Sequence, residues 1–314
     1  MKTVSVVIPC YRSSQTIERV VEEIKEAVKD RKGWTYQIVL VNDCSPDNTF
    51  QVIEGLCKKD KKIVGVDMAR NFGQETAIVA GLGYATGDAV VVMDDDGQHP
   101  AHQMWKLIDK MEEGYDVVYA NFPHKHHSAF KRLASDLHGK INEWIGCKPK
   151  GIILSSFWCL SPFCAQELSL YDSPFTSRGG YLMRITQRFA NVEIDEHRDR
   201  LAGESGYNLR KMFELWFSNF TNFSIVPIRA MAKMGWGVAA LGFLFGIYLI
   251  IRKLVNPNVQ LGYTSIMSVI LFIGGIIMAM IGFIGEYIGR TYMTVSGMPQ
   301  FIVRREVNVP NQED

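Results

Sequence analysis

The sequence predicts an α/β domain with a mostly parallel sheet, followed by an interfacial helix and a two-helix transmembrane hairpin. Two observations predict this fold class. Within the first 121 residues, runs rich in Val and Ile alternate with helical stretches, which is typical of a parallel sheet covered by helices on both faces. By contrast, the span from Leu254 to Gly285 contains no charged residue, although the first 215 residues have the composition of a soluble protein.

The elements of the first domain follow from local composition and turn signals. Asp47 and Pro100 are helix-start signals, and Gly33, Gly87 and Gly114 are stop signals. The predicted strands are Val4–Ile8, Gln37–Val41, Ile63–Asp67, Ala89–Met93, Asp116–Ala120 and, after a basic amphipathic stretch at 125–151, Ile152–Leu160. The predicted helices are Ser14–Lys29, Asn48–Lys58, Gln74–Tyr84 and Ala101–Glu113.

The C-terminal third is predicted to associate with a membrane. Met234–Ile251 has 18 uncharged residues and Thr264–Gly285 has 22. At about 1.5 Å per residue, each can cross a hydrocarbon core of about 30 Å. Two buried helices of a soluble domain are the alternative. We divide the chain into a head (1–206), an amphipathic aromatic interfacial helix (207–230), the two spans (231–290) and a tail (291–314).

The charge distribution predicts that the head faces the cytosol. A hairpin returns the chain to the side from which it came, so head and tail share that side. Arg229, Lys233 and Arg290 on that side outnumber Arg252 and Lys253 in the connection, as expected for the cytosolic face. We therefore expect a multi-pass protein of the cytoplasmic (inner) membrane. Hairpins of this size often self-associate, so a homo-oligomer is possible.

The bulk composition agrees with a cytosolic head. The six cysteines show no C-x-x-C spacing, which favours reduced thiols over a disulfide framework. The first apolar run, Val4–Ile8, is too short for a signal peptide. A net charge of +1 gives no indication of nucleic-acid binding, and we expect none.

The strongest chemical signal is Val90–Pro100, V-V-V-M-D-D-D-G-Q-H-P, where a buried-strand pattern ends in three consecutive aspartates. Ligands of open α/β sheets bind at such carboxyl ends. Along an extended backbone Asp94 and Asp96 share one face with Gln98, while Asp95 points to the other face. These oxygen ligands predict Mg²⁺ or Mn²⁺ on the first face and leave the middle carboxylate for a nucleoside. An acidic loop without a metal is the alternative.

Polar residues also follow the other predicted strands. Tyr11, two residues after Pro9, can stack on a nucleobase or pack against a helix. Asp43 can accept hydrogen bonds from ribose hydroxyls or base N–H groups, whereas we assign Asp47 to helix capping. Arg70–Gly73 precedes a helix and can contact a nucleotide or form a plain turn.

A second candidate site lies at the end of the head. Residues 198–207 combine cations, small residues and a hydroxyl directly before the aromatic helix. A loop of this composition can hold a phosphate, and an exposed linker is an equally good interpretation.

Together these segments resemble family 2 glycosyltransferases of GT-A fold. The closest resemblance is to the polyprenyl-phosphate glycosyltransferases, the group of dolichol-phosphate mannose synthase and bactoprenol glucosyltransferase. The resemblance covers nearly the whole chain, and its motifs are V-V-I-P-x-Y at Val6–Tyr11, V-D-D-x-S-x-D-x-T at Val41–Thr49, R-N-F-G at Arg70–Gly73, A-T-G-D at Ala85–Asp88, M-D-x-D-x-Q-x-P at Met93–Pro100 and G-x-S-x-Y at Gly203–Tyr207.

The resemblance implies a role for each motif. It implies a metal held by Asp96, assisted by Asp94 and Gln98, with Asp94, Asp96 and Arg200 as the catalytic residues. The implied nucleotide-sugar contacts are Pro9, Tyr11, Asp43, Arg70, Asp94 and Asp95. The implied contacts to the acceptor phosphate are Arg178, Arg200 and Ser205.

Three departures from the family pattern weaken individual assignments. Arg12-Ser13 replaces the Asn-Glu that follows the tyrosine in many relatives, so no acidic nucleoside contact is assigned there. Asn42 replaces the first Asp of its motif, and Gly206 replaces a basic residue. The Q-x-x-R-W element of processive synthases is absent, which favours transfer of a single sugar.

The resulting expectation is an inverting, metal-dependent transferase that moves one sugar from a nucleotide-diphosphate sugar, by preference a UDP-sugar, to a polyprenyl phosphate. A phosphate monoester is already ionised near neutral pH, so no strong general base is required. The alternatives are another membrane glycolipid or polysaccharide acceptor and a catalytically silent membrane-anchored partner subunit. The sequence identifies neither the sugar nor the base.

Overall fold

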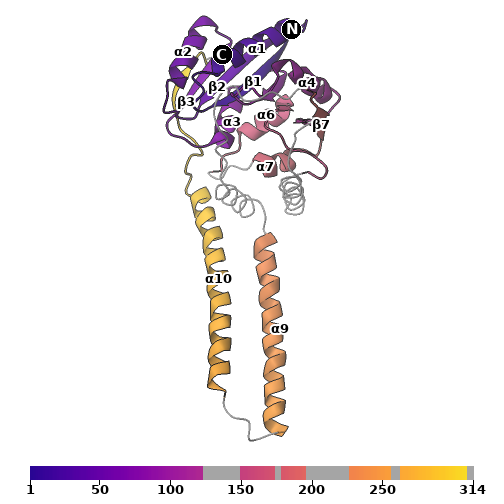
Figure 1. The fold of residues 1–314 in the computed structure, drawn as a ribbon, viewed down its shortest axis with the longest axis vertical. Helices are drawn as coiled ribbons and strands as arrows, with labels where there is room; N and C mark the ends of the chain where they lie inside the picture. Colours follow the sequence, from indigo (N-terminus) through magenta and orange to yellow (C-terminus); the bar gives the residue numbers. More distant parts are fainter. Residues whose placement is uncertain (123–148, 174–177, 196–225, 256–261, 310–314) are drawn as a thin grey trace. The chain divides into compact units, whose positions relative to one another are not determined.

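The computed structural model describes residues 1–122, 149–173, 178–195, 226–255 and 262–309 of the chain (Figure 1). It divides into two units. The first joins the N-terminal part of the chain to the residues from Pro299 onward, and the second comprises Glu214–Met298. We describe each unit by itself.

The first unit is built on a mostly parallel sheet, as predicted. Across the described residues the sheet has eight strands in the order β7-β5-β6-β4-β1-β2-β3-β8. β1 pairs in parallel with β2 and β4, β2 with β3, and β5 with β7. The strands are β1 (Lys2–Cys10), β2 (Trp34–Asn42), β3 (Ile63–Met68), β4 (Ala89–Val92), β5 (Val117–Asn121), β6 (Trp158–Leu160), β7 (Phe189–Glu193) and β8 (Val303–Val307).

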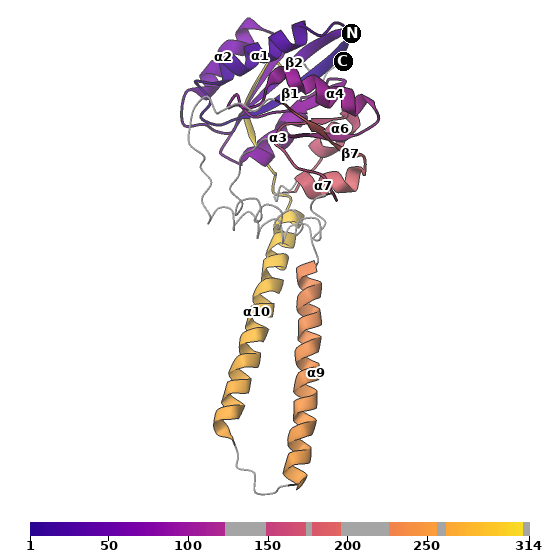
Figure 2. The ribbon, with the colours of Figure 1, turned by 45° about the vertical axis from the view of Figure 1, so that its right-hand side comes forward.

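Helices cover both faces of this sheet, so alternate strand residues face different cores. Val6 of β1 packs on the face of α1, α2 and α4, whereas Val7 packs on the face of α3, α6 and α7. The two helix sets lie on opposite sides of the sheet in Figures 1 and 2. The helices are α1 (Ile17–Lys29), α2 (Thr49–Lys59), α3 (Gln74–Leu82), the 3₁₀ turn η1 (Ala101–Gln103), α4 (Met104–Glu112), α6 (Pro162–Ser169) and α7 (Arg178–Ile185).

The predicted strand Ile152–Leu160 was wrong over most of its length. Only its last three residues form β6, which pairs antiparallel with both β4 and β5. The N–H of Ile153 donates to Oδ1 of Asn191 at 2.8 Å, and the amide of Asn191 donates back to the Ile153 carbonyl at 2.8 Å. Because a side chain takes these backbone bonds, this part of the segment is a loop tied to β7.

Two start signals had the expected effect. Oδ1 of Asp47 accepts bonds from the backbone N–H of Thr49 at 3.3 Å and from its hydroxyl at 2.6 Å, so Asp47 satisfies the first N–H of α2 from one residue before the cap position, which Asn48 occupies. Pro100 precedes η1, which leads into α4.

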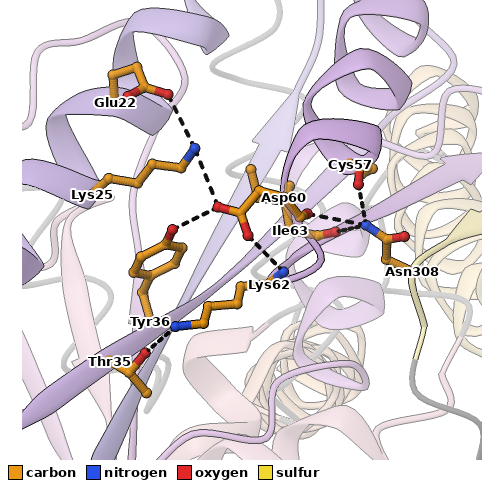
Figure 3. A network of polar contacts seen from close by, with 9 residues as sticks. All are labelled: Glu22, Lys25, Thr35, Tyr36, Cys57, Asp60, Lys62, Ile63 and Asn308. Carbon is orange, nitrogen blue, oxygen red and sulfur yellow. Dashed lines mark hydrogen bonds and ion pairs between the residues drawn. The ribbon is translucent and has the colours of Figure 1, made fainter.

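The predicted tail contributes the last strand of the sheet, which the sequence did not predict. β8 pairs antiparallel with β3, and Asn308 follows it at a φ of 59°. The side-chain amide of Asn308 donates to the carbonyls of Cys57, Asp60 and Ile63 at 2.6, 3.3 and 2.9 Å (Figure 3). The carboxylate of Asp60 accepts from the Tyr36 hydroxyl at 2.7 Å. One amide therefore fixes the end of β8 to the turn between α2 and β3.

The second unit is a pair of long helices, α9 (Val226–Val255) and α10 (Tyr263–Val295), which lie side by side in Figures 1 and 2. These helices contain the two apolar spans expected from the sequence. Among the described residues, one stretch, Phe272–Val295, is long and apolar enough to cross a membrane by length and composition. The interfacial helix predicted for 207–230 falls almost entirely outside the described residues.

Candidate functional site

A cavity of about 950 Å³ opens at the carboxyl ends of β1, β2 and β4. Parallel strands bring the loops that follow them to one edge of the sheet, which is where ligands of α/β proteins bind. Four segments line the cavity. The first two follow β1 and β2 and contribute all of Pro9–Thr16 except Ser13, and Asp43, Asp47 and Asn48. The other two are the entry to α3, with Asn71, Gly73 and Gln74, and the acidic loop Asp94–Asp96. The cavity thus joins most of the predicted nucleotide-sugar residues.

The three aspartates after β4 have different partners. β4 ends at Val92, so the residues after it are no longer extended strand and strand alternation does not control their side chains. Asp94 accepts at Oδ1 from the side-chain amide of Gln74 at 2.6 Å. Asp96 accepts at Oδ1 from the backbone N–H of Gln98 at 3.0 Å. Gln98 is not among the lining residues, whereas all three aspartates are.

Asp95 fixes the loop after β1. Its Oδ2 accepts from the backbone N–H of Tyr11 at 3.1 Å and from the Ser13 hydroxyl. Burial raises the pKa of Asp95 to about 6, and the neighbouring charges of Asp94 and Asp96 add to the effect. The bonds from Ser13 and Tyr11 act in the opposite direction. Asp95 is therefore a support for the cavity wall in an environment that disfavours its charge.

Asp43 fixes a second loop in the same manner. It is 3% exposed, and its two oxygens accept from the backbone N–H groups of Phe72 and Gly73 at 2.7 and 2.9 Å. Burial raises the pKa of Asp43, and the two N–H donors offset part of that rise. Asp43 thus connects the loop after β2 to the R-N-F-G segment, a link that the sequence did not predict.

The remaining donor-side predictions have different outcomes. Pro9 and Tyr11 line the cavity, and Tyr11 is 46% exposed there, with the Arg12 guanidinium 5.5 Å from its ring centroid. This position leaves part of the Tyr11 ring accessible from the cavity. Arg70 does not line the cavity. Its guanidinium lies 4.7 Å from the centroid of the Phe72 ring.

The structure does not describe the predicted acceptor side. Arg178 begins α7, and its side chain lies outside the described part of the chain. Arg200 and Ser205 also lie outside it. Their roles remain predictions.

Sequence reasoning missed Ser13 and Gln74, which hold Asp95 and Asp94. Their only signal is position, because Ser13 lies two residues after the P-x-Y tyrosine and Gln74 directly follows R-N-F-G. Among the residues that the structure describes, no group of three or more His, Cys, Asp or Glu side chains is arranged to hold a metal ion.

Several known proteins are similar to this chain over nearly its full length. The prophage bactoprenol glucosyl transferase homolog of Escherichia coli (strain K12) is 31% identical over 303 residues, 96% of this chain and 98% of that protein. The undecaprenyl-phosphate 4-deoxy-4-formamido-L-arabinose transferase of Shewanella sediminis (strain HAW-EB3) is 30% identical over 308 residues, 96% of this chain and 91% of that one. Among solved structures, mannosyl-3-phosphoglycerate synthase from Rubrobacter xylanophilus matches with a TM-score of 0.49 and 18% identity, over 76% of this chain and 75% of that chain.

Two family descriptions account for most of the chain. Residues 5–171, which contain most of β1, the strands β2 to β6 and the whole acidic loop, match glycosyl transferase family 2. Residues 226–291, which contain α9 and most of α10, match the GtrB C-terminal hairpin. From these matches and the full-length relatives, the chain belongs to glycosyl transferase family 2.

Proposed function

We propose that this glycosyltransferase moves one sugar from a nucleotide-diphosphate sugar, by preference a UDP-sugar, to a polyprenyl phosphate at the cytosolic face of the membrane. The observation that carries the proposal is the cavity in which Asp94, Asp95 and Asp96 lie together with the exposed Tyr11. The names of the full-length relatives support the acceptor, because they include bactoprenol and undecaprenyl-phosphate transferases.

The acidic loop fits a divalent cation of the Mg²⁺ or Mn²⁺ type. Such ions are commonly held by one or two carboxylates together with substrate phosphates, which suits Asp94 and Asp96 on one cavity wall. A cation bound there would neutralise charge that develops on the leaving diphosphate. Gln98 is the weaker candidate ligand, because it does not line the cavity.

The protein's own residues bind and orient the donor. Tyr11 offers its exposed ring to the nucleobase, while Asp43 and Asp95 hold the loops on either side of it. The acceptor phosphate arrives ionised, so its oxygen can attack without a general base. Arg178, Arg200 and Ser205 are proposed to hold that phosphate at the correct distance.

The membrane part of the proposal concerns α9 and α10. We propose that both helices cross the bilayer and keep the head within reach of a lipid-bound acceptor. The length of Phe272–Val295 and the charge difference between the helix ends support this orientation. A single cysteine placed at Asn258 should react with a membrane-impermeant thiol reagent from the periplasmic side of intact cells. Labelling only after the cells are opened would contradict this orientation.

The decisive experiment is a transfer assay. Purified full-length protein is incubated with Mg²⁺ or Mn²⁺, undecaprenyl phosphate and a panel of UDP-, GDP- and dTDP-sugars. A lipid-linked sugar should form with one donor and disappear when a chelator is added. Product formation that is unchanged by the chelator would contradict the metal assignment, and no product with any donor would contradict the proposed reaction.

A further inference from the structure

We propose that His99 is a positioning residue that fixes Asp94 by accepting the backbone N–H of Asp94 at Nδ1. The inference rests on the proposed function, which assigns Asp94 to the cation and the leaving diphosphate. His99 falls at an unspecified position of the M-D-x-D-x-Q-x-P motif, and sequence reasoning gave it no role.

The contacts of His99 join its ring to Asp94. Nδ1 accepts from the backbone N–H of Asp94 at 3.0 Å, so this nitrogen presents its lone pair to the acidic loop. Nε2 lies 3.3 Å from Oγ of Ser156 and 3.8 Å from Oδ2 of Asp94. The ring thus contacts both the backbone and the carboxylate of the same aspartate.

Aromatic side chains hold the ring in place. His99 is 6% exposed, and it stacks on Phe157, with the centroids 5.0 Å apart and the planes 12° from parallel. It also stacks on Phe122, at 6.2 Å and 14°. Phe157 precedes β6 and Phe122 follows β5, so two neighbouring strands fix the plane of the imidazole.

Asp94 is therefore held from two directions. Gln74 at the start of α3 donates to one carboxylate oxygen, and His99 fixes the backbone and faces the other oxygen. Residues that orient a metal-binding side chain typically change metal affinity or activity about 10- to 100-fold when they are replaced. If His99 only filled space, an apolar residue of similar size such as leucine would leave metal affinity and activity unchanged.

The test compares His99→Asn and His99→Gln, whose side-chain amides reach the positions of different ring nitrogens. Asparagine can place its oxygen near Nδ1 and accept the Asp94 N–H, whereas glutamine reaches toward the Nε2 position. Binding of uridine diphosphate to the full-length protein is measured by calorimetry with and without Mn²⁺, together with thermal unfolding. Histidine at position 102 is exposed on η1 and provides the matched control, His102→Asn.

We expect His99→Leu and His99→Gln to weaken Mn²⁺-dependent binding about 10- to 100-fold, and His99→Asn to stay within about threefold of wild type. His102→Asn should bind like wild type. Equal affinity of the Asn and Gln variants, or wild-type affinity of His99→Leu, would overturn the proposal. Because no lipid is present, these outcomes are independent of whether the protein glycosylates a polyprenyl phosphate.

The wild-type protein offers a second measurement that needs no variant to fold. In ¹⁵N-labelled protein, a scalar coupling across the hydrogen bond should connect the backbone amide of Asp94 with Nδ1 of His99. A proton bound to Nδ1 would overturn the proposal, because that nitrogen could then accept no hydrogen bond.

Discussion

The loops after β2 and β4 each place an aspartate at the same cavity, Asp43 buried and Asp95 partly buried, but the two carboxylates have different surroundings. Asp43 accepts backbone N–H bonds at both oxygens, from Phe72 and Gly73. Asp95 accepts bonds from Tyr11 and Ser13 at one oxygen and lies between Asp94 and Asp96. Burial of an aspartate therefore does not by itself identify the chemical site. The loop after β4 gathers three negative charges, whereas the one carboxylate of Asp43 is hydrogen-bonded at both oxygens by backbone N–H groups.

The largest expected effect is the loss of a carboxylate from the acidic loop. Asp96→Asn and Asp94→Asn should each lower kcat on the order of 100- to 1000-fold, the scale of one lost electrostatic contact to developing charge. Steady-state transfer assays measure the effect. Asp109→Asn, on the exposed surface of α4, is the matched control and should have no effect. Near wild-type turnover in both acidic-loop variants would show that the loop after β4 contributes no more to the reaction than the loop after β2.

Next in size is a pH-dependent stability change at Asp95. The pKa of Asp95 is raised from 3.8 to about 6 in the folded state. Ionisation of Asp95 therefore lowers the free energy of unfolding, by the full amount above about pH 6 and not at all below about pH 3.8. With a chelator present, Asp95→Asn should therefore stabilise the protein at pH 7.5 by about 2–3 kcal/mol. The gain should vanish near pH 4, as measured by chemical denaturation. A gain that does not depend on pH would show that charge is not its cause.

A smaller effect is expected when Asp43 is changed to Asn. One of its two acceptor oxygens becomes an NH₂ group that faces a backbone N–H, so the loop at Phe72 and Gly73 loses a bond. The KM for the nucleotide sugar should rise about tenfold with little change in kcat, since a buried unsatisfied donor costs about 1–3 kcal/mol. Asp109→Asn, on the exposed surface of α4, is again the control and should leave this KM unchanged. A fall in kcat as large as that of Asp96→Asn would give the loop after β2 a chemical role.

The smallest functional effect should come from a region away from the cavity. Asn308→Ala removes three amide contacts and leaves an alanine at positive φ, which should cost about 1–3 kcal/mol of stability without altering KM for either substrate. Asn308→Gly keeps the backbone conformation accessible and isolates the loss of the amide. A large change in donor KM would mean that β8 influences the cavity.

Local patterns predicted much of the fold and the acidic side of the cavity. The Val- and Ile-rich runs identified β1 to β5, because a strand buried on both faces needs continuous apolar residues. They could not identify β8, V-R-R-E-V, because an edge strand with exposed charged residues lacks such a run. They also extended β6 too far, since the bonds that Asn191 makes to Ile153 come from 38 residues away.

The replacement of the first motif aspartate by Asn42 also becomes clear only in three dimensions. The Asn42 amide donates to Oδ1 of Asp67 at 2.8 Å on the neighbouring strand. An aspartate at position 42 would place two buried carboxylates together, which is unfavourable without a proton or a cation between them. Arg305 of β8 lies 3.4 Å from the other oxygen of Asp67.

The alternating α/β order, the apolar hairpin and the acidic loop could be predicted from the amino-acid sequence, because these features depend on periodicity and composition along the chain. The separate contacts of the three aspartates, the link from Asp43 to the R-N-F-G loop and the position of His99 against Asp94 became visible only in the folded protein. Hydrogen bonds between side chains and distant backbone groups depend on which strands become neighbours. Sheet order is set by packing across the whole domain, so no local pattern encodes it.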